Sequence, residues 1–531
     1  MKKLAIALLA ILCQTTLYAA TQQVEQWKRF ELSFQYSAAV NPFTDVDLSA
    51  TFTNGSQTIT VRGFYDGNDT FRIRFMPTET GTWRYITKSN AFPLSNQRGE
   101  LECVPPTAGN HGMVSPRGWG FAYSDGTPYM PFGTTIYSLV HYDRDRMERT
   151  MKSLSELPFN KVRICFLTKI YKHTGEDDQY QFPYMVDRTM PRQAQSRQVH
   201  TWDFSRFNPE YFRRFEEQID RMADMGIECD LILFHPYDGG FFGFDRMTRN
   251  QDESYLRYLV ARLGSFRNVW WSLANEYDNM ARVKHADDWE AILKTVVEED
   301  PYRHMVSNHC DKEYYAWYKP EVTHVSIQDG STVDDFGRCV LFRQVYKKPV
   351  IVDEMGYEGT FADRWGNLSG QEETKRFWIA SISGCYATHG EVMPDADGNH
   401  TNVWSENGDF LRGECGPRIA FLRKLMEKTG AWRVIDNWTY HNIAIATNRQ
   451  VIVYFGTEAP KAWEVMIPTR SGWGDHAKFT AELVDTWNMT ITPVKGTFEL
   501  KNIRYEAAEA NGKKIKMPGK PYMALILTKV E

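Results

Sequence analysis

The chain of 531 residues lacks an excess of positive charge, and this narrows the choice of partners. It contains 62 Lys and Arg against 67 Asp and Glu, which gives a net charge of -5. Proteins that bind nucleic acid rely on clustered basic residues that neutralise phosphates. We therefore expect no nucleic-acid partner.

Long apolar runs are also missing. The longest candidate, residues 4–12, is shorter than the roughly 18 residues that a membrane helix needs. It follows Lys2 and Lys3 and precedes a small residue, Ala19, which is typical of a signal peptide over residues 1–19. We expect export to the periplasm or beyond the cell and no membrane span. Cys13 is a poor candidate for a lipid anchor, because Ile11-Leu12 lacks the small residue that a lipoprotein signal usually has.

Cysteine is scarce, and the number that remains is odd. Of the 8 in the chain, one lies in the predicted signal peptide, so a paired disulfide framework is not expected. Four others fall inside or just beyond predicted strands, where they are typical of small buried apolar residues: Cys165, Cys229, Cys310 and Cys385.

Motifs for several kinds of chemistry are absent. No Gly-rich phosphate loop follows a predicted strand, and no Gly-x-Ser-x-Gly elbow occurs. A metal-dependent hydrolase would have to take its ligands from Asp230, His235, Asp238 and His309. The first predicted strand leads to Thr134-Thr135-Ile136-Tyr137 without a ligand pair, which disfavours such a site. We expect neither a cofactor nor a metal.

What the chain does contain is a three-part pattern. Residues 24–105 alternate in short β-type runs separated by turn signals, which predicts an Ig-like β-sandwich. Residues 118–428 alternate strands with amphipathic helices, and residues 430–531 return to β-type alternation, which predicts a second β-sandwich. The strands of the middle part are predicted at 129–135, 161–167, 229–234, 269–273, 304–307, 323–327, 349–352 and 384–387. Eight such strands favour a central (β/α)8 TIM barrel, and the missing phosphate loop disfavours a doubly wound sheet.

Two of these strands end in a glutamate. Glu276 follows the fourth strand in Trp271-Ser272-Leu273-Ala274-Asn275-Glu276, and Glu354 follows the seventh in Val350-Ile351-Val352-Asp353-Glu354. Active sites of (β/α)8 barrels are built at these carboxyl ends. A retaining glycosidase needs two carboxyl groups about 5–5.5 Å apart, one as acid/base and one as nucleophile. The alternative for either residue is that it merely caps the helix that follows.

An Asn-Glu pair after the fourth strand and a Glu-x-Gly after the seventh resemble the motifs of clan A of the glycoside hydrolases, the (β/α)8 retaining glycosidases. The layout of β-sandwich, barrel and β-sandwich resembles a bacterial subgroup of predicted glycoside hydrolases. The resemblance implies that Glu276 is the acid/base and Glu354 the nucleophile. It also implies that Asn275 hydrogen-bonds the sugar 2-hydroxyl and that Arg163, in the second strand, keeps the nucleophile ionised. A purely structural ion pair is the alternative for Arg163.

The other strand ends supply candidates for substrate contact. They are His235, Tyr237 and Asp238 after the third strand, His309 after the fifth, Gln328 after the sixth, and His389 and Trp404 after the eighth. Trp404 is the predicted stacking platform for a sugar, and the alternative is a tryptophan that pins the loop to the barrel. Gln328 stands where much of clan A has a tyrosine that touches the nucleophile, so the resemblance fails there, and Tyr357 is a candidate substitute.

These observations predict a retaining glycoside hydrolase that acts on a polysaccharide or its fragments without a cofactor. The long segment 172–201 after the second strand predicts a wall at one end of the cleft and therefore exo action. The alternative is a carbohydrate-binding protein that uses the same scaffold without turnover. The sequence does not specify the sugar, the linkage or the oligomeric state.

Overall fold

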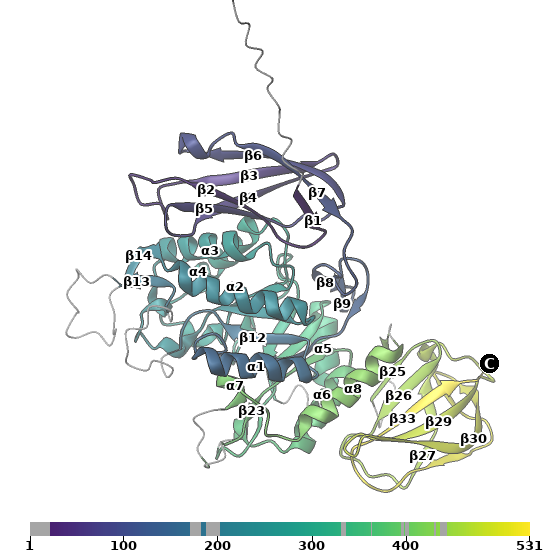
Figure 1. Ribbon diagram of the computed structural model, residues 1–531. Coiled ribbons are helices and arrows are strands. Elements are labelled where there is room, and N and C mark those ends of the chain that lie inside the picture. Colours follow the sequence, from purple (N-terminus) through teal and green to yellow (C-terminus); the bar gives the residue numbers. More distant parts are fainter. Residues whose placement is uncertain are drawn as a thin grey trace, which may run out of the picture.

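The computed structural model describes residues 22–169, 182–186, 202–330, 336–362, 364–394, 398, 403–429, 432–435 and 443–530. The predicted signal peptide with Cys13, and all of segment 172–201 except 182–186, lie outside these residues. The described chain folds into an N-terminal β domain, a central domain of strands and helices, and a C-terminal β domain (Figure 1). All seven described cysteines are buried and free, as the sequence predicted for four of them.

The N-terminal domain is one seven-stranded sheet that folds over itself around an apolar core. The bend lies in β4, which pairs with β3 up to Arg62 and with β5 from Gly63 onward. A Cβ atom at Gly63 would lie 2.8 Å from the Leu48 side chain, so the bend needs a glycine. The strands, in sheet order, are β1 (Gln22–Glu25), β7 (Arg98–Val104), β6 (Gly81–Ser89), β3 (Leu48–Asn54), β4 (Gln57–Tyr65), β5 (Thr70–Phe75) and β2 (Phe30–Gln35).

The central domain is built on a parallel sheet that closes on itself. Its strands, in sheet order, are β17 (Val306–Ser307), β16 (Val269–Ala274), β15 (Glu228–Phe234), β12 (Lys161–Cys165), β11 (Phe132–Thr135), β22 (Tyr386–His389), β20 (Val350–Glu354), β19 (Val325–Gln328) and β18 (His309–Cys310). The two ends of this order, β17 and β18, are separated only by Asn308 and are halves of one interrupted strand. The Asn308 side chain fills the gap by accepting a hydrogen bond from the backbone N–H of Ala274, 3.0 Å away. The sheet is therefore barrel-like.

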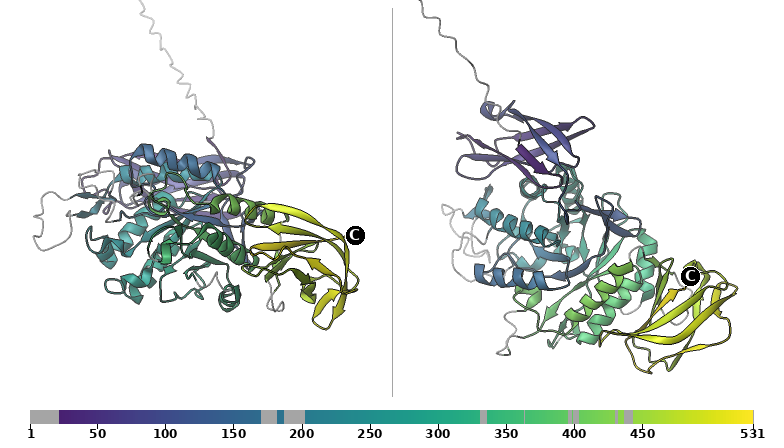
Figure 2. Two further views of the ribbon diagram at one scale, coloured as in Figure 1. Left: turned by 90° about the horizontal axis from the view of Figure 1, so that it is seen from below. Right: turned by 45° about the vertical axis from the view of Figure 1, so that its right-hand side comes forward.

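Helices cover the outside of this sheet, as the predicted alternation of strands and helices requires (Figures 1 and 2). They are α1 (Arg144–Glu156), α2 (Pro209–Asp224), α3 (Arg249–Leu263), α4 (Ala286–Glu299), α5 (Phe336–Tyr346), α6 (Gly370–Ile382) and α8 (Cys415–Thr429), with the short α7 (Trp404–Asn407) before the last. Three small strands, β8 (Val114–Arg117), β9 (Gly120–Tyr123) and β10 (Pro128–Tyr129), pack on Trp270 and Ile351 near the amino ends of β16 and β20. The opposite, carboxyl ends remain for the site.

The C-terminal domain is an antiparallel β unit that packs on α6 and α8 (Figure 1). Trp378 of α6 stacks on Tyr454 with ring centroids 5.1 Å apart, and the Arg418 guanidinium of α8 lies 4.1 Å from the Trp487 ring. Its main sheet runs β24 (Arg433–Val434), β25 (Ile443–Ala446), β26 (Gln450–Tyr454), β33 (Met523–Lys529), β29 (Lys478–Asp485), β30 (Thr490–Ile503), β31 (Glu506–Glu509) and β28 (Met466–Pro468).

Candidate active site

The structure brings the two predicted carboxylates together at the carboxyl ends of the barrel-like sheet. Glu354 is the last residue of β20, and Glu276 lies two residues beyond β16. Gln328, the last residue of β19, lies between them. Its amide nitrogen, in the orientation that satisfies its hydrogen bonds, lies 3.1 Å from Glu276 Oε1 and 3.1 Å from Glu354 Oε2. These two oxygens are therefore no more than about 6 Å apart, which is below the separation typical of inverting glycosidases.

Glu354 is surrounded by groups that stabilise its charge. It is 3% exposed, and the Tyr137 hydroxyl donates a hydrogen bond to Oε1. Arg163 Nη1 lies 3.5 Å from the same oxygen, and the Tyr357 hydroxyl also hydrogen-bonds this carboxylate. Hydrogen bonds and an adjacent guanidinium favour the ionised form of a carboxyl group. The Glu354 carboxylate is thus fixed in a buried site by hydroxyl groups and a guanidinium.

Glu276 has the opposite surroundings. Burial and then the neighbouring charge of Glu354 raise its pKa from 4.5 to about 7, against the lowering effect of the Asn279 hydrogen bond. Asn279 Nδ2 donates to Glu276 Oε2 and to Asp311 Oδ2, each at 3.1 Å, and the Asp311 charge raises the pKa further. A carboxyl group of this kind keeps its proton near neutral pH.

The backbone at Glu276 adopts a conformation that few non-glycine residues take. Its φ is 47° and its ψ is 54°, in the left-handed region. Such a conformation persists when the surroundings enforce it, and it is frequent at functional sites. Here His309 Nδ1 accepts a hydrogen bond from the Glu276 backbone N–H, 3.2 Å away. His309 therefore positions the loop that carries Glu276. It is fully buried, and its contact with substrate stays a prediction.

Asn275 connects both sides of the site. Its Oδ1 accepts a hydrogen bond from Arg163 Nη2 at 2.6 Å, and its Nδ2 donates to the Tyr237 hydroxyl. Tyr237 also hydrogen-bonds Glu276. Asn275 is fully buried, so its predicted contact with a sugar hydroxyl stays a prediction.

A layer of buried ions below the site holds Arg163 in place. Lys161 Nζ lies 2.6 Å from Asp230 and 2.7 Å from Asp353. Burial opposes the ionisation of Asp353, but Lys161 and Arg163 outweigh it and hold the pKa of this carboxyl well below its usual value. Asp230 is thus part of a structural ion cluster, not of the metal site that was the alternative for it.

Two predicted contacts after the third strand support the loop instead of facing the cleft. The Asp238 carboxylate is 1% exposed and accepts hydrogen bonds from the backbone N–H groups of Phe242 and Phe244. His235 is 3% exposed, with Nε2 2.9 Å from the Leu167 carbonyl oxygen and Nδ1 accepting from the Tyr237 N–H. The polar atoms of both residues are used to fold the loop that presents Tyr237, and their contact with a sugar stays a prediction.

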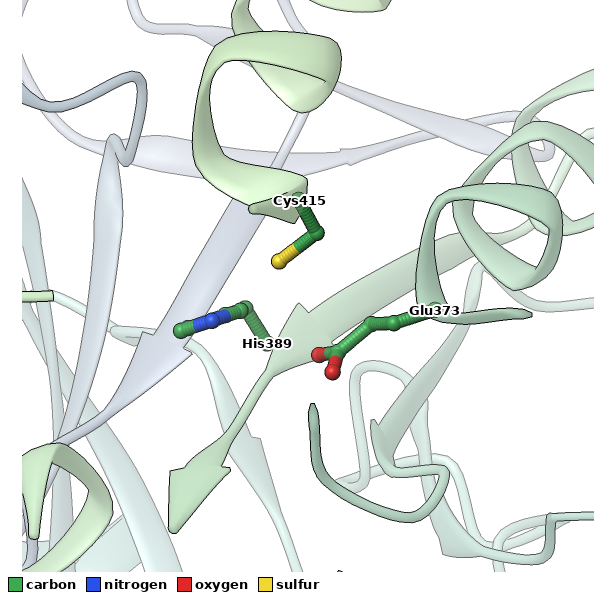
Figure 3. Close-up of side chains that lie close together, drawn as sticks. All are labelled: Glu373, His389 and Cys415. Atoms are coloured by element: carbon green, nitrogen blue, oxygen red, sulfur yellow. The ribbon is translucent and has the colours of Figure 1, made fainter. Parts of the chain in front are cut away.

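Trp404 and His389 are further corrections. Trp404 is fully buried and its indole N–H donates to Thr134 Oγ1 at 2.7 Å, so it anchors a loop and is not an exposed sugar platform. His389 is also fully buried and lies near Glu373 and Cys415 (Figure 3), with ligand atoms of the three within 4.8 Å of one another. Thr134 Oγ1 lies 3.0 Å from His389 Nδ1, and both Glu373 oxygens accept backbone N–H groups. These contacts use His389 Nδ1 and both Glu373 oxygens, whereas His389 Nε2 is buried without a hydrogen-bond partner among the described residues.

The sequence analysis missed three groups that the structure places at the site. In the sequence, Tyr137 belongs to a segment that lacks a pair of metal ligands, and nothing there predicts a role for it. In the structure its hydroxyl contacts Glu354, the candidate nucleophile. Lys169 Nζ lies 3.9 Å from the Tyr137 ring centroid, 4.2 Å from that of Tyr237 and 3.0 Å from Glu406 Oε2. Asn279 hydrogen-bonds Glu276. Tyr137 and Lys169 each follow the end of a predicted strand within four residues. This position is the one feature of the sequence that could have indicated a place at the site.

An open cavity of about 800 Å³ adjoins the carboxylates. Gln328 and Asp311 line it, and so do the aromatic residues Tyr314 and Trp365. Volumes of this order are usual for small-molecule sites. Within the described residues, no helix has the length and apolar character to cross a membrane.

Comparisons with known proteins agree with this architecture. A family model described as an apiosidase-like catalytic domain matches residues 116–432, and two domains of unknown function, DUF5060 and DUF5605, match residues 23–90 and 438–528. No curated protein matches the chain.

Solved structures match it as well. A predicted glycoside hydrolase from Bacteroides vulgatus is 38% identical, with a TM-score of 0.89 over 96% of this chain and 100% of that one. A family 5 glycoside hydrolase from the same organism is 14% identical, with a TM-score of 0.58 over 79% of this chain and 94% of that one, and shares the fold. Because the catalytic model and the 38% identical relative both cover most of the chain, this protein belongs to the family of apiosidase-like catalytic domains.

Proposed function

We propose that this protein is a retaining glycoside hydrolase in which Glu354 is the nucleophile and Glu276 the general acid/base. The observation that carries the proposal is the pair of carboxylates, buried at Glu354 and half-buried at Glu276, that Gln328 bridges at 3.1 Å from each. An oxygen separation below about 6 Å suits attack by a carboxylate, whereas an inverting enzyme needs room for a water molecule between the two groups. We also propose that the barrel-like sheet is a (β/α)8 barrel, with an Ig-like domain before it and a β-sandwich after it.

The two steps follow from the environments of the carboxylates. In the first, Glu354 attacks the anomeric carbon, the glycosidic bond breaks, and the leaving oxygen takes the proton of Glu276. In the second, ionised Glu276 removes a proton from water, whose oxygen displaces Glu354 from the sugar and restores both residues. The pKa of about 7 lets Glu276 hold a proton for the first step and accept one in the second.

The substrate is a carbohydrate, and the family description directs the first trials toward terminal apiose residues. We further propose exo action, as the sequence predicts from segment 172–201. A product series containing mixed long oligosaccharides would contradict exo action, whereas release of single sugars from chain ends supports it.

The test is hydrolysis of a panel of aryl glycosides, including an apioside, and of pectic and hemicellulosic oligosaccharides. Wild type is compared with Glu354→Ala, Glu276→Ala and the control Glu298→Ala, an exposed glutamate on α4. We expect loss of about 10⁴-fold or more for Glu354→Ala, rescue by azide, and retained anomeric configuration by NMR. Turnover that survives both active-site substitutions, or binding of sugar without any turnover, would refute the proposal.

Export is a separate proposal, because residues 1–19 lie outside the described structure. The sequence favours cleavage after Ala19, so the mature protein should begin at Ala20. Mass spectrometry of protein secreted by a Gram-negative host measures this directly. An acylated N-terminus at Cys13 would show lipid anchoring instead.

A further inference from the structure

We propose that the cavity lined by Gln328, Asp311, Tyr314 and Trp365 is the binding site for the leaving-group part of the substrate, and that it accepts a neutral sugar. The inference rests on the proposed function, because it identifies which side of the two carboxylates each part of the substrate occupies. Nothing in the two carboxylates alone assigns these sides.

The cavity belongs to the acid's side of the site. Asp311, one of its lining residues, is joined to Glu276 through Asn279, with both hydrogen bonds at 3.1 Å. In the proposed mechanism Glu276 gives its proton to the oxygen of the departing group, so that group must lie next to it. A cavity whose lining residue Asp311 is linked to Glu276 in this way is therefore placed to hold the group that departs.

The other side of the site is closed by hydroxyl groups. The Tyr137 and Tyr357 hydroxyls both hydrogen-bond Glu354, and they lie 3.3 Å from each other. Tyr137 is 5% exposed and Tyr357 8%, and neither is among the described residues that line the cavity. The enclosed side suits the sugar that forms the covalent intermediate, and the open cavity suits a departing chain.

The lining combines aromatic faces with polar groups, as a sugar site requires. Tyr314 is 49% exposed, and Phe342 holds its ring by an edge contact with centroids 5.2 Å apart. Trp365 contacts Tyr357 with its ring at 66° and centroids 6.2 Å apart. Aromatic faces stack on the C–H faces of sugars, while the carboxylates and amides around them accept and donate hydrogen bonds to hydroxyls.

The charges around the cavity come in pairs. Lys312 contacts the Asp311 carboxylate, Arg376 Nε lies 2.9 Å from Glu372, and Arg338 lies 3.2 Å from Asp329. Each of these three basic groups thus has an acidic partner in the protein. A carboxylate on the substrate would have to compete with these partners, whereas hydroxyl groups would not, and this favours a neutral sugar.

The test measures transfer of the glycosyl group to an acceptor. The donor is the aryl glycoside that wild type hydrolyses best, and the acceptors are methyl β-glucoside, which is neutral, and methyl galacturonoside, which is charged. We compare wild type with Tyr314→Ala, Trp365→Ala and the control Tyr318→Ala, whose ring is 73% exposed and lies outside the cavity lining. We expect each cavity variant to lower the ratio of transfer to hydrolysis about tenfold with methyl β-glucoside, because a stacking face is lost. The control should match wild type.

The outcomes separate this inference from the proposed function. Unchanged transfer ratios in both cavity variants, with normal hydrolysis and an inactive Glu354→Ala, would overturn the inference alone. Better transfer by wild type to the galacturonoside than to the glucoside would overturn the neutral-sugar assignment. An absence of turnover with every donor would overturn both proposals. Thermal unfolding of each variant controls for folding, and Tyr314→Ala, with its half-exposed ring, is sufficient if Trp365→Ala unfolds.

Discussion

At the scale of single residues, the two carboxylates at the site differ in the charges of their partners. Glu354 contacts hydroxyls and the guanidinium of Arg163, whereas Glu276 shares Asn279 with the carboxylate of Asp311. Positive and hydrogen-donating neighbours favour an anion, and a negative neighbour favours a retained proton. The acid and the nucleophile that we propose are therefore the same type of side chain in two different surroundings.

Replacement of Asp311 by asparagine should change the pH profile. Glu276 must be protonated for the first step, so kcat/KM should be high below its pKa of about 7 and fall as the pH rises through that value. The Asp311 charge raises this pKa, so Asp311→Asn should move the basic limb to lower pH. At pH 8 we expect kcat/KM to fall about threefold relative to wild type, with little change at pH 5.5. An unshifted basic limb, measured with an aryl glycoside from pH 5 to 9, would contradict the assignment.

Removal of the Tyr137 hydroxyl should weaken catalysis without weakening the fold. Tyr137→Phe takes away a hydrogen bond to the charged Glu354, an interaction typically worth about 1.5–3 kcal/mol, and should lower kcat about tenfold to a hundredfold. Tyr255→Phe is the matched control, because this buried hydroxyl donates to the Leu233 carbonyl away from the carboxylates. Equal kcat values for the two variants would show that the Tyr137 contact has no catalytic effect.

The positions of some single residues could be predicted from the sequence, whereas the roles of others could not. Glu276 and Glu354 could be identified because strand order predicts which residues meet at the carboxyl ends. The roles of Trp404 and Tyr137 could not, because both lie beyond a strand end, where the period of two no longer predicts direction. In the structure the Trp404 indole points to Thr134 in the core, and the Tyr137 hydroxyl reaches Glu354.

At the scale of elements, the N-terminal domain is fixed to the helices of the central domain by buried ion pairs. Arg262 of α3 lies 2.6 Å from Glu216 of α2 and 2.7 Å from Asp66, which follows β4. Arg74 of β5 lies 2.9 Å from the same Glu216. A single carboxylate thus neutralises two guanidinium groups, one from each domain.

Loss of Glu216 should therefore destabilise this junction. Glu216→Ala leaves Arg74 and Arg262 buried together without their shared partner, a change that typically costs about 3–5 kcal/mol. We expect a clearly lower midpoint for the first unfolding transition in guanidinium, followed by tryptophan fluorescence. Glu100→Ala, which breaks the exposed pair with Arg84, should cost less than about 1 kcal/mol. Similar midpoints for both variants would contradict the role of the buried network.

The elements were predictable to different degrees. The order of the parallel strands follows from buried apolar runs, and seven of the eight predicted runs overlap a single strand of the sheet. The eighth, residues 304–307, corresponds to a strand that Asn308 divides into β17 and β18. Its interruption depends on the contact of Asn308 with Ala274 of the neighbouring strand, a tertiary hydrogen bond that a local pattern does not contain.

At the scale of the whole molecule, burial raises the pKa of several carboxyl groups. Burial raises the pKa of Glu228 to about 8 and that of Glu391 to about 7, and it raises the pKa of Asp252 to about 7 despite Lys284. Each of these groups binds its proton more tightly in the folded chain than in the unfolded chain. Between the unfolded and folded pKa values the unfolded chain releases these protons first, so the folded state loses stability as the pH rises.

Glu228→Gln should isolate one such contribution. The carboxyl group lies at the amino end of β15, where Trp270 Nε1 donates to it at 2.8 Å, and glutamine keeps an oxygen for this bond. The folded pKa of about 8 lies above the unfolded value of 4.5, so the cost of Glu228 is absent below pH 4.5 and grows until about pH 8. The variant should therefore match wild type at pH 5 and be more stable at pH 8 by a few kcal/mol, on the order of 1.4 kcal/mol per unit of pKa shift.

Thermal or guanidinium unfolding at both pH values measures this difference, with Glu298→Gln as the exposed control. If the stability of the Glu298→Gln control relative to wild type changed with pH as that of Glu228→Gln does, the change would be due to net charge and not to burial of Glu228. A Glu228→Gln variant less stable than wild type at pH 8 would show that Glu228 ionises in the folded chain at no cost. The expected divergence with pH requires instead that Glu228, at the opposite end of the barrel-like sheet from Glu354, is a neutral carboxyl group in the folded chain. Because the same closed sheet separates the two groups, Glu228→Gln should leave the pH profile of hydrolysis unchanged.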